Sequence, residues 1–345
     1  MNIQDLIRPT IKALKPYASA RDEFKGSKDN LTFLDANENP FDNGINRYPD
    51  PQQGELKALI SKIKKVPSGN ILLGNGSDEV LDLLMRMFCE PNKDNILILP
   101  PTYGMYEVLA NINAVEVFKT NLSSELFQPK TTAILEAATA NSKILFLCSP
   151  NNPTGNSFEA SSVEFLLKNF KGIVVVDEAY IDFSEDESWL SRLNEFPNLV
   201  VTQTLSKAYG MAGIRLGMCF ASAEIIATLN KIKPPYNINE LTQRKAIEGL
   251  NKIALVDSQI TCLLEERDAL LKALEDVDFI EKVYPSDANF VMVKVDDADK
   301  RYQQLIEKGI VIRNRTTQPL CENCLRLTIG TKEENINLIE NFKKL

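Results

Sequence analysis

Short apolar runs alternate along the chain with segments in which apolar residues recur every three or four positions. Runs of the first kind predict buried strands, and segments of the second kind predict amphipathic helices. Strands are predicted at 95–99, 143–148, 172–176, 199–202 and 215–221. Because Ile, Leu and Val occupy both faces of these runs, we expect a mostly parallel sheet with helices on both sides, the arrangement of an α/β protein.

The chain length and one change in composition divide this pattern into domains. A chain of 345 residues is long enough for about two domains. The turn-rich stretch KPPY at 233–236 predicts a break, after which a long helical segment runs to about residue 270. Strand-like pieces at 290–295 and 325–329 and a terminal helix follow. We therefore predict an N-terminal arm at 1–45 that packs with the small domain, a large domain at 46–240 and a small α+β domain at 241–345.

Composition excludes several classes of protein. The net charge of -8 is spread along the chain, whereas a nucleic-acid binder needs a basic face. The first residues lack the apolar core of a signal peptide and no later run is long enough to span a membrane, so a cytoplasmic protein is expected. In that compartment six cysteines predict free thiols. The pair Cys321-x-x-Cys324 has no second pair to complete a zinc site, and no metal is expected.

The chain contains no histidine. This absence rules out Ser-His-Asp and Cys-His nucleophile systems, histidine metal sites and histidine general bases. Any proton transfer must therefore use Lys, Asp, Glu, Tyr or Cys, and lysine becomes the leading candidate for a base.

A glycine-rich stretch, GNGSDE at 74–79, follows the apolar run 71–73 and opens the predicted helix 79–88. Its glycines allow a tight turn, and free N–H groups at the start of a helix can bind a phosphate. The alternative is an ordinary Asn-Gly hairpin turn. The helical continuation weighs against the hairpin, but the stretch alone does not decide between them.

Two polar positions follow buried strands. Four apolar residues deliver Asp177 to the carboxyl end of the strand 172–176, where open α/β sheets bind ligands. A protonated pyridine nitrogen would satisfy its carboxylate, and so would a helix cap or an ion pair. Asn152 lies in the turn SPNNPTG at 149–155, where it could bind a ligand oxygen or do ordinary turn work.

Lys207 comes shortly after the strand 199–202, between Ser206 and the glycine-flanked Arg215. A single lysine is usually a surface residue. A lysine in an enclosed site can lose its proton and form a Schiff base with a carbonyl.

These four elements, in this order, resemble the fold-type-I pyridoxal-phosphate (PLP) enzymes, and specifically the class I and II aminotransferases. Twenty-five positions separate Asn152 from Asp177, and thirty separate Asp177 from Lys207. The resemblance extends from LDANENP at 34–40 to LRLTIG at 325–330. It implies a large domain with a mostly parallel seven-stranded sheet flanked by helices, and a smaller α+β domain at the C-terminus.

Within that family the likeness is greatest to members that act on histidinol phosphate. It rests on ANENP at 36–40, NRYP at 46–49, FCEP at 88–91, PPTYGMY at 100–106, DEAYIDF at 177–183 and CLRLTIGT at 324–331. The resemblance implies reversible transamination between L-histidinol phosphate and 2-oxoglutarate, giving imidazole-acetol phosphate and L-glutamate, in L-histidine biosynthesis.

The resemblance also implies roles in holding the PLP ring. Lys207 is the covalent anchor of the cofactor and the base of the reaction. Asp177 pairs with the pyridine nitrogen and keeps it protonated. Tyr180 and Asn152 hydrogen-bond the phenolic oxygen, and Tyr103 stacks on the ring.

The cofactor phosphate is assigned to a separate group of residues. The resemblance implies that Ser206, Arg215 and the backbone of Ser77 and Asp78 hold it. Tyr48 is expected to reach the phosphate in the neighbouring subunit, so the resemblance implies a homodimer.

The remaining implied residues bind substrate. Arg326 alternates along a predicted strand with apolar residues at 325, 327 and 329, so its side chain is expected on the opposite face. A guanidinium there suits a carboxylate or phosphate, and a solvent-facing arginine is the alternative. Arg313 is a helper for the substrate phosphate, Tyr17 lines the side-chain pocket, and Asn152 contributes to both binding sites.

One motif departs from the family pattern, since Tyr209-Gly210 stands where a Phe and a small residue are expected. Three other functions remain open. An aromatic amino-acid aminotransferase would use the same lysine with another side-chain pocket. A PLP lyase or decarboxylase would act on a phosphorylated amino acid by breaking a different bond. A PLP-binding transcription regulator would need a DNA-binding segment, and no basic stretch is available for one.

Overall fold

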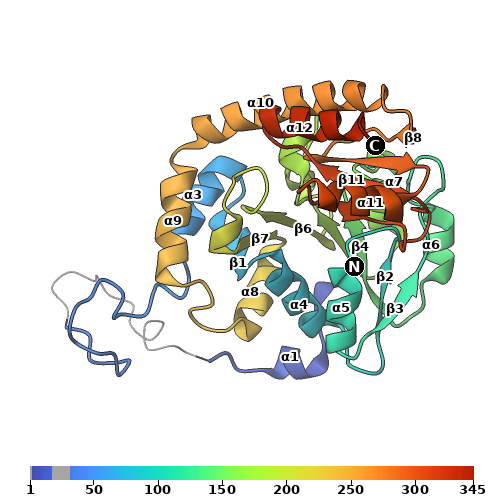
Figure 1. Ribbon diagram of the computed structural model, residues 1–345. Coiled ribbons are helices and arrows are strands. Elements are labelled where there is room, and N and C mark those ends of the chain that lie inside the picture. Colours follow the sequence, from blue (N-terminus) through green and yellow to red (C-terminus); the bar gives the residue numbers. More distant parts are fainter. Residues whose placement is uncertain (1, 18–31) are drawn as a thin grey trace.

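The computed structural model describes residues 2–17 and 32–345. A seven-stranded sheet and a four-stranded sheet organise the chain (Figure 1). The strands are β1 (Ile71–Asn75), β2 (Asn95–Ile98), β3 (Glu116–Lys119), β4 (Ser142–Cys148), β5 (Ile173–Asp177), β6 (Leu199–Thr204), β7 (Leu216–Phe220), β8 (Ile280–Val283), β9 (Phe290–Val295), β10 (Arg313–Asn314) and β11 (Cys324–Thr328). The helices are α1 (Pro9–Ala13), α3 (Gly54–Lys64), α4 (Ser77–Phe88), α5 (Met105–Ile112), α6 (Thr131–Ala137), α7 (Ala160–Asn169), α8 (Ala223–Ile232), α9 (Glu240–Leu250), α10 (Ile253–Leu274), α11 (Ala298–Glu307) and α12 (Lys332–Phe342).

The large sheet has the strand order β1-β7-β6-β5-β4-β2-β3. Strand β7 is antiparallel to both of its neighbours, and the other strands run parallel to one another. The predicted fold class, a mostly parallel seven-stranded sheet with a smaller α+β domain, is therefore confirmed. In such a sheet the loops after the parallel strands meet at one edge, where ligands bind.

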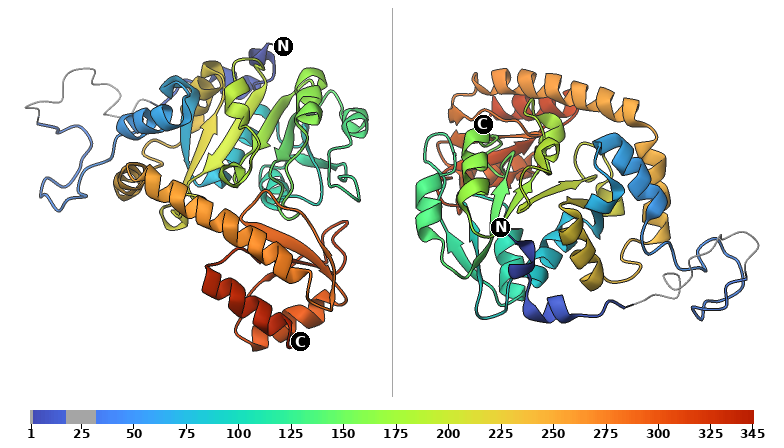
Figure 2. Two further views of the ribbon diagram at one scale, coloured as in Figure 1. Left: turned by 90° about the horizontal axis from the view of Figure 1, so that it is seen from above. Right: turned by 180° about the vertical axis from the view of Figure 1, so that it is seen from behind.

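Helices cover both faces of the large sheet, as the apolar runs predicted. Val174 and Val176 pack in a core with α3, α6, α7 and α9. Val175, the residue between them, packs in a second core with α4, α5 and α8 on the opposite face (Figures 1 and 2). Because side chains alternate along a strand, a run that is apolar at every position supplies both cores.

The small sheet is antiparallel, in the order β10-β11-β9-β8, and forms a second body beside the large sheet (Figure 2). Helix α10 joins the two bodies along their junction. Leu325 and Leu327 of β11 pack in the core of the small domain. Cys324, one position earlier, packs toward the large domain instead. The long helical segment predicted after residue 236 is divided between α9 and α10.

The described start of the N-terminal arm packs on the large domain. Ile3 and Ile7 are buried in the core shared by α4, α5 and α8. The Arg8 N–H donates to the carbonyl of Met87 at 3.1 Å, and its guanidinium forms an ion pair with Glu90 at 3.2 Å. The prediction that the arm packs with the small domain is wrong for these residues, because their apolar side chains complete the α4–α8 face. The domain limits at 45 and 240 stay predictions.

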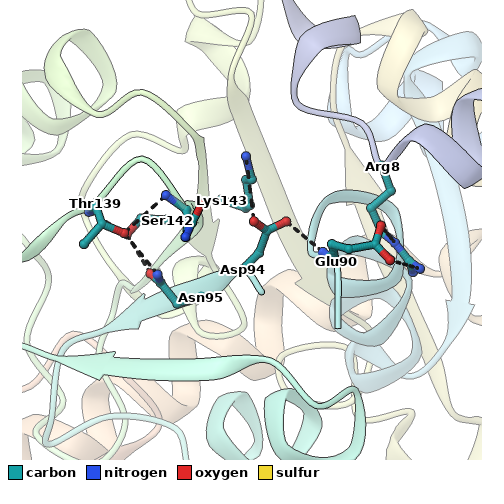
Figure 3. Close-up of polar contacts among 8 residues, drawn as sticks. Arg8, Glu90, Asp94, Asn95, Thr139, Ser142 and Lys143 are labelled. Atoms are coloured by element: carbon teal, nitrogen blue, oxygen red, sulfur yellow. Dashed lines mark hydrogen bonds and ion pairs between the residues drawn. The ribbon is translucent and has the colours of Figure 1, made fainter. Parts of the chain in front are cut away.

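This docking point belongs to a polar network at the N-terminal edge of the large sheet (Figure 3). The Glu90 N–H donates to Asp94 at 2.8 Å, and Lys143 lies 4.0 Å from the other Asp94 oxygen. Ser142 at the start of β4 donates to Asn95 at the start of β2 at 2.6 Å. The network thus ties the arm and the first residues of two strands together.

The six cysteines form no disulfide. Across residues 2–17 and 32–345, no helix has the length and apolar character needed to cross a lipid bilayer.

Candidate active site

A pocket lies at the edge of the large sheet where β1, β4, β5 and β6 end and β7 begins. Nine residues predicted for the site line it, and so do Cys148, Ala179 and Thr204. The nine are Ser77, Asp78, Tyr103, Asn152, Asp177, Tyr180, Ser206, Lys207 and Arg215. Segments far apart in the sequence thus bring the predicted residues to one place.

Asp177 is the most enclosed charged group of the pocket, with 3% of its surface exposed. The hydroxyl of Tyr106 donates to one carboxylate oxygen at 2.7 Å, and that of Thr202 donates to the other at 3.1 Å. Among the described residues no cation forms an ion pair with Asp177. Burial raises its pKa, although both hydroxyl donors oppose the rise. A cation placed beside this carboxylate would remove most of the cost of burying it.

Lys207 stands in the open part of the pocket, with its amine 5.7 Å from the centre of the Tyr180 ring. Partial burial lowers the pKa of this amine, and the charges of Arg326 and Arg215 lower it further. A larger fraction of the amine is therefore neutral near pH 7 than for a surface lysine, and the neutral amine is the nucleophile.

The N-terminus of α4 forms an anion cradle. Gly76 precedes the helix with φ +77, and no side-chain hydrogen bond caps the helix. A Cβ on Gly76 would lie 2.6 Å from the Arg215 guanidinium, and one on Gly217 would lie 2.3 Å from the Ser77 nitrogen. Only glycine lets the guanidinium and the strand approach the helix start this closely. The alternative interpretation of GNGSDE at 74–79 as a hairpin turn is excluded, because β1 is followed by the helix α4 and not by a second strand.

The side chains of Asp78 and Ser206 lie beside the cradle. Tyr103 donates to Asp78 at 3.0 Å, and Arg215 lies 3.9 Å from the same carboxylate. Ser206 accepts a hydrogen bond from Thr204 at 3.0 Å. Arg215 itself adopts φ +55, so β7 begins one residue later than the predicted strand.

Asn152 connects the pocket with the small domain. The guanidinium of Arg326 donates to its Oδ1 at 2.5 Å. Because arginine has no acceptor, this contact orients the amide so that Nδ2 remains available as a donor toward the pocket. Arg326 lies on the face of β11 opposite Leu325 and Leu327, as the alternation predicted.

Four predicted residues are not among those that line this pocket. Arg326 is one of them and connects with the pocket through its hydrogen bond to Asn152. Arg313 is exposed and is the cross-strand partner of Arg326. Tyr48 is 52% exposed and stacks on Tyr236 with ring centres 4.5 Å apart. Tyr17 is 74% exposed and precedes a segment outside the described residues. Within one chain the structure therefore brings neither tyrosine to the pocket.

The residues present fit PLP. Buried Asp177, with no ion pair among the described residues, suits a positively charged ring nitrogen. The uncapped α4 terminus beside Arg215 suits a phosphate. Lys207, with its lowered pKa, suits attachment to a carbonyl.

The family described as aminotransferase class I and II matches residues 30–342. The chain belongs to the class I and II aminotransferases. It is 65% identical to the histidinol-phosphate aminotransferase of Flavobacterium johnsoniae over all of this chain and 99% of that protein. It is 59% identical to the same-named protein of Christiangramia forsetii, covering all of this chain and 98% of that protein. The solved structure of the histidinol-phosphate aminotransferase from Clostridium acetobutylicum has a TM-score of 0.80 at 26% identity, over 87% of this chain and 90% of that chain.

The family predicted from the motifs is therefore confirmed, and so is the predicted likeness to the members that act on histidinol phosphate. At Tyr209 the chain departs from the family pattern, in which a Phe is expected. The Tyr209 ring is buried, and the Lys64 amine lies 5.3 Å from its centre. The phenol thus occupies a core position that a Phe could fill.

Sequence reasoning missed Tyr106 and Thr202, which bond Asp177, and Arg315, which neighbours Arg326. Tyr106 lies within the PPTYGMY motif, three residues after Tyr103, so the spacing of one helical turn could have indicated it. Thr202 is the strand partner of Asp177, and only the register of β5 and β6 reveals that pairing.

Proposed function

We propose that this aminotransferase interconverts L-histidinol phosphate and 2-oxoglutarate with imidazole-acetol phosphate and L-glutamate, in L-histidine biosynthesis. The observation that carries the proposal is full-length identity of 65% to a relative named histidinol-phosphate aminotransferase. The pocket supports it, because an amine, a buried carboxylate and an anion cradle converge there.

The proposed cofactor is PLP, which when bound supplies the electron sink that makes the Cα proton of the amino donor removable. Asp177 would hold the ring nitrogen positive. Ser206, Arg215 and the backbone N–H groups of Ser77 and Asp78 would hold the phosphate.

Lys207 is the proposed tether and base. Its free Nζ would take the proton from the carbon of the amino donor that bears the amino group. The lowered pKa keeps part of this amine neutral near pH 7, as a general base must be. Asn152 and Tyr180 would position the ring, and Tyr103 would cover one of its faces.

Arg326 is proposed to bind the anionic group of both substrates. Histidinol phosphate offers a phosphate, whereas glutamate offers carboxylates, so one guanidinium must serve two kinds of anion. The fork of an arginine can make two parallel hydrogen bonds to either group.

We further propose that the enzyme acts in the cytoplasm as a homodimer in which Tyr48 reaches the phosphate site of the neighbouring subunit. The segment from residue 32 to α3 extends away from the rest of the chain (Figure 1). Leu34, Phe41, Ile45 and Tyr48 on it are between 52% and 87% exposed. A partner subunit would cover such apolar side chains. Six unpaired thiols suit a reducing compartment.

One assay separates this proposal from its alternatives. The purified holoenzyme is given 2-oxoglutarate with histidinol phosphate, phenylalanine or phosphothreonine as the amino donor, and glutamate and carbon dioxide are measured. We expect glutamate with a strong preference for histidinol phosphate. A preference for phenylalanine would indicate an aromatic aminotransferase. Carbon dioxide without glutamate from phosphothreonine would indicate a decarboxylase.

A further inference from the structure

Three arginines lie on the face of the small sheet that is turned toward the pocket. Arg313 and Arg326 are cross-strand partners in the β10–β11 pair. The pairing continues one step further, because the Arg315 N–H donates to the carbonyl of Cys324 at 2.8 Å. Since side chains alternate along a strand, Arg313 and Arg315 share the face of Arg326. This face contacts the large domain, as the hydrogen bond from Arg326 to Asn152 and the packing of Cys324 demonstrate.

The three guanidinium groups repel one another and lack a protein counter-charge. None of them forms an ion pair with a carboxylate in the described part of the chain. The Nε atoms of Arg315 and Arg326 are buried and have no hydrogen-bond partner among the described residues. Burial lowers the pKa of Arg315 to about 10, and the neighbouring Arg326 and Arg313 contribute to this shift. Like charges placed directly opposite each other destabilise a sheet. Such an arrangement favours the binding of an anion that supplies the missing charge.

The number of arginines distinguishes one class of anion from another. A carboxylate carries one charge and is satisfied by one bidentate guanidinium. A phosphate monoester carries about -1.5 to -2 charges at neutral pH and has three acceptor oxygens. Glutamate carries two carboxylates on separate carbons, so only one of them lies at the arginine group at a time, and Arg326 can bind that carboxylate by itself. A phosphate places its whole charge on one group, which Arg326 and the half-buried Arg315 can bind together.

We propose that Arg315 is a specificity-determining residue that binds the phosphate group of the amino donor, an inference that rests on the function proposed above. Arg315 contributes to the binding of histidinol phosphate and contributes little to the binding of glutamate. Arg326 remains the contact that both substrates share.

The test measures each half-reaction separately with Arg315→Met, Arg315→Lys and Arg86→Met holoenzymes. Arg86 is an exposed arginine in the last turn of α4, at the end of that helix away from the pocket, so its replacement removes the same charge outside the arginine group. A charge-assisted hydrogen bond accounts for roughly a 10- to 100-fold change in binding. We therefore expect kcat/KM for histidinol phosphate to fall by about that factor in Arg315→Met, with a much smaller fall for glutamate. Arg315→Lys should lie between wild type and Arg315→Met, and Arg86→Met should match wild type.

Inorganic phosphate supplies a second readout that needs no amino donor. In the holoenzyme the cofactor already fills the α4 cradle, so added phosphate reports on the arginine group. We expect phosphate to raise the Tm of wild type and to raise that of Arg315→Met much less. Without phosphate, the Tm of Arg315→Met should equal or exceed that of wild type, because a repelled charge has been removed.

The outcomes separate the inference from the proposed function. Equal losses for both substrates with a lowered Tm would mean that Arg315 is structural, and the inference would be wrong. Unchanged constants and an unchanged phosphate response in Arg315→Met would also overturn it. If wild type rejects histidinol phosphate while its phosphate response depends on Arg315, the proposed function fails and the anion site stands.

Discussion

At the N-terminal edge of the large sheet a buried carboxylate, Asp94, has a protein cation beside it, whereas the buried carboxylate at the carboxyl edge, Asp177, forms no ion pair in the described part of the chain. Arg8 pairs with Glu90, and Asp94 lies between the Glu90 N–H and Lys143 (Figure 3). At the opposite edge, Asp177 is equally buried but bonds only hydroxyl groups and backbone. Both edges belong to the same sheet, so the fold alone does not account for the difference.

The difference reflects where the counter-charge comes from. A buried ionised group is costly unless it is paired. At the N-terminal edge the chain supplies the pair, and the charges hold the arm and the strand ends in place. At the carboxyl edge the cost remains until a ligand brings the opposite charge. Perturbed pKa values without a protein partner therefore indicate a binding function, whereas paired charges indicate a structural one.

The largest expected effect is that of replacing Lys207 at the carboxyl edge, with a lysine of the N-terminal edge as the control. Lys207→Ala should reduce turnover by roughly 10³-fold or more, because both the covalent anchor and the base are lost. The visible absorbance of the bound cofactor should change as well. Lys143→Ala removes a lysine of the other edge and should leave turnover unchanged. Steady-state kinetics and absorbance spectra check both variants, and normal turnover in Lys207→Ala would refute the mechanism.

A carboxylate at each edge gives the next largest contrast. Asp177→Asn cannot hold a ring nitrogen positive, so turnover should fall by roughly 10²-fold or more while the cofactor-free protein keeps its stability. Asp94→Asn should leave turnover intact and lower the free energy of unfolding by about 1–3 kcal/mol, since the partly buried Lys143 amine loses its counter-charge. Urea unfolding and kinetics on both variants would reveal any reversal of this pattern.

Much of the fold could be predicted because its strands are apolar on both faces. The piece 290–295 coincides with β9, and 143–148 lies within β4. Strand β3 was missed, since its side chains are exposed or half-buried at the edge of the sheet and its pattern is not apolar. The docking of the arm was predicted wrongly, because Ile3 and Ile7 are too few to tell which surface they cover.

Part of the site could be predicted, because its residues come at or just after the ends of parallel strands. Asp177 is the last residue of β5, Asn152 lies in the loop after β4, and Lys207 lies in the loop after β6. The topology brings these strand ends together at one edge of the sheet. The partners of those residues could not be predicted. Thr202 lies beside Asp177 because the two residues are paired across β5 and β6. Arg315 lies beside Arg326 because of the register of the β10–β11 pair, which the sequence does not reveal.

Glu178, next to Asp177, sharpens the comparison through the pH dependence of stability. It is 1% exposed and accepts hydrogen bonds from Ser188, Trp189 and Gln203. Burial raises its pKa from 4.5 to about 7. The folded state therefore holds the proton more tightly than the unfolded state. The stability that protonation contributes is fully present below pH 4.5 and is lost as the pH rises through about 7.

We expect wild type to lose about 2–3 kcal/mol more stability than Glu178→Gln between pH 4.5 and 7, since one pKa unit corresponds to ~1.4 kcal/mol. Urea unfolding of both proteins at several pH values measures this difference. Parallel pH profiles would mean that Glu178 does not titrate in this range.

The smallest expected effect concerns the arm. The Arg8 and Glu90 side chains are 18% and 36% exposed, so solvent screens part of their attraction. A pair of this kind contributes about 0.2–1 kcal/mol, which a double-mutant cycle on Arg8→Ala and Glu90→Ala can isolate. Turnover should stay unchanged in all three variants, because the pair lies at the edge of the sheet opposite the pocket. A loss of turnover that exceeds the loss of stability would mean that the arm communicates with the active site. The two edges would then no longer be independent, and the assignment of structure to one and binding to the other would fail.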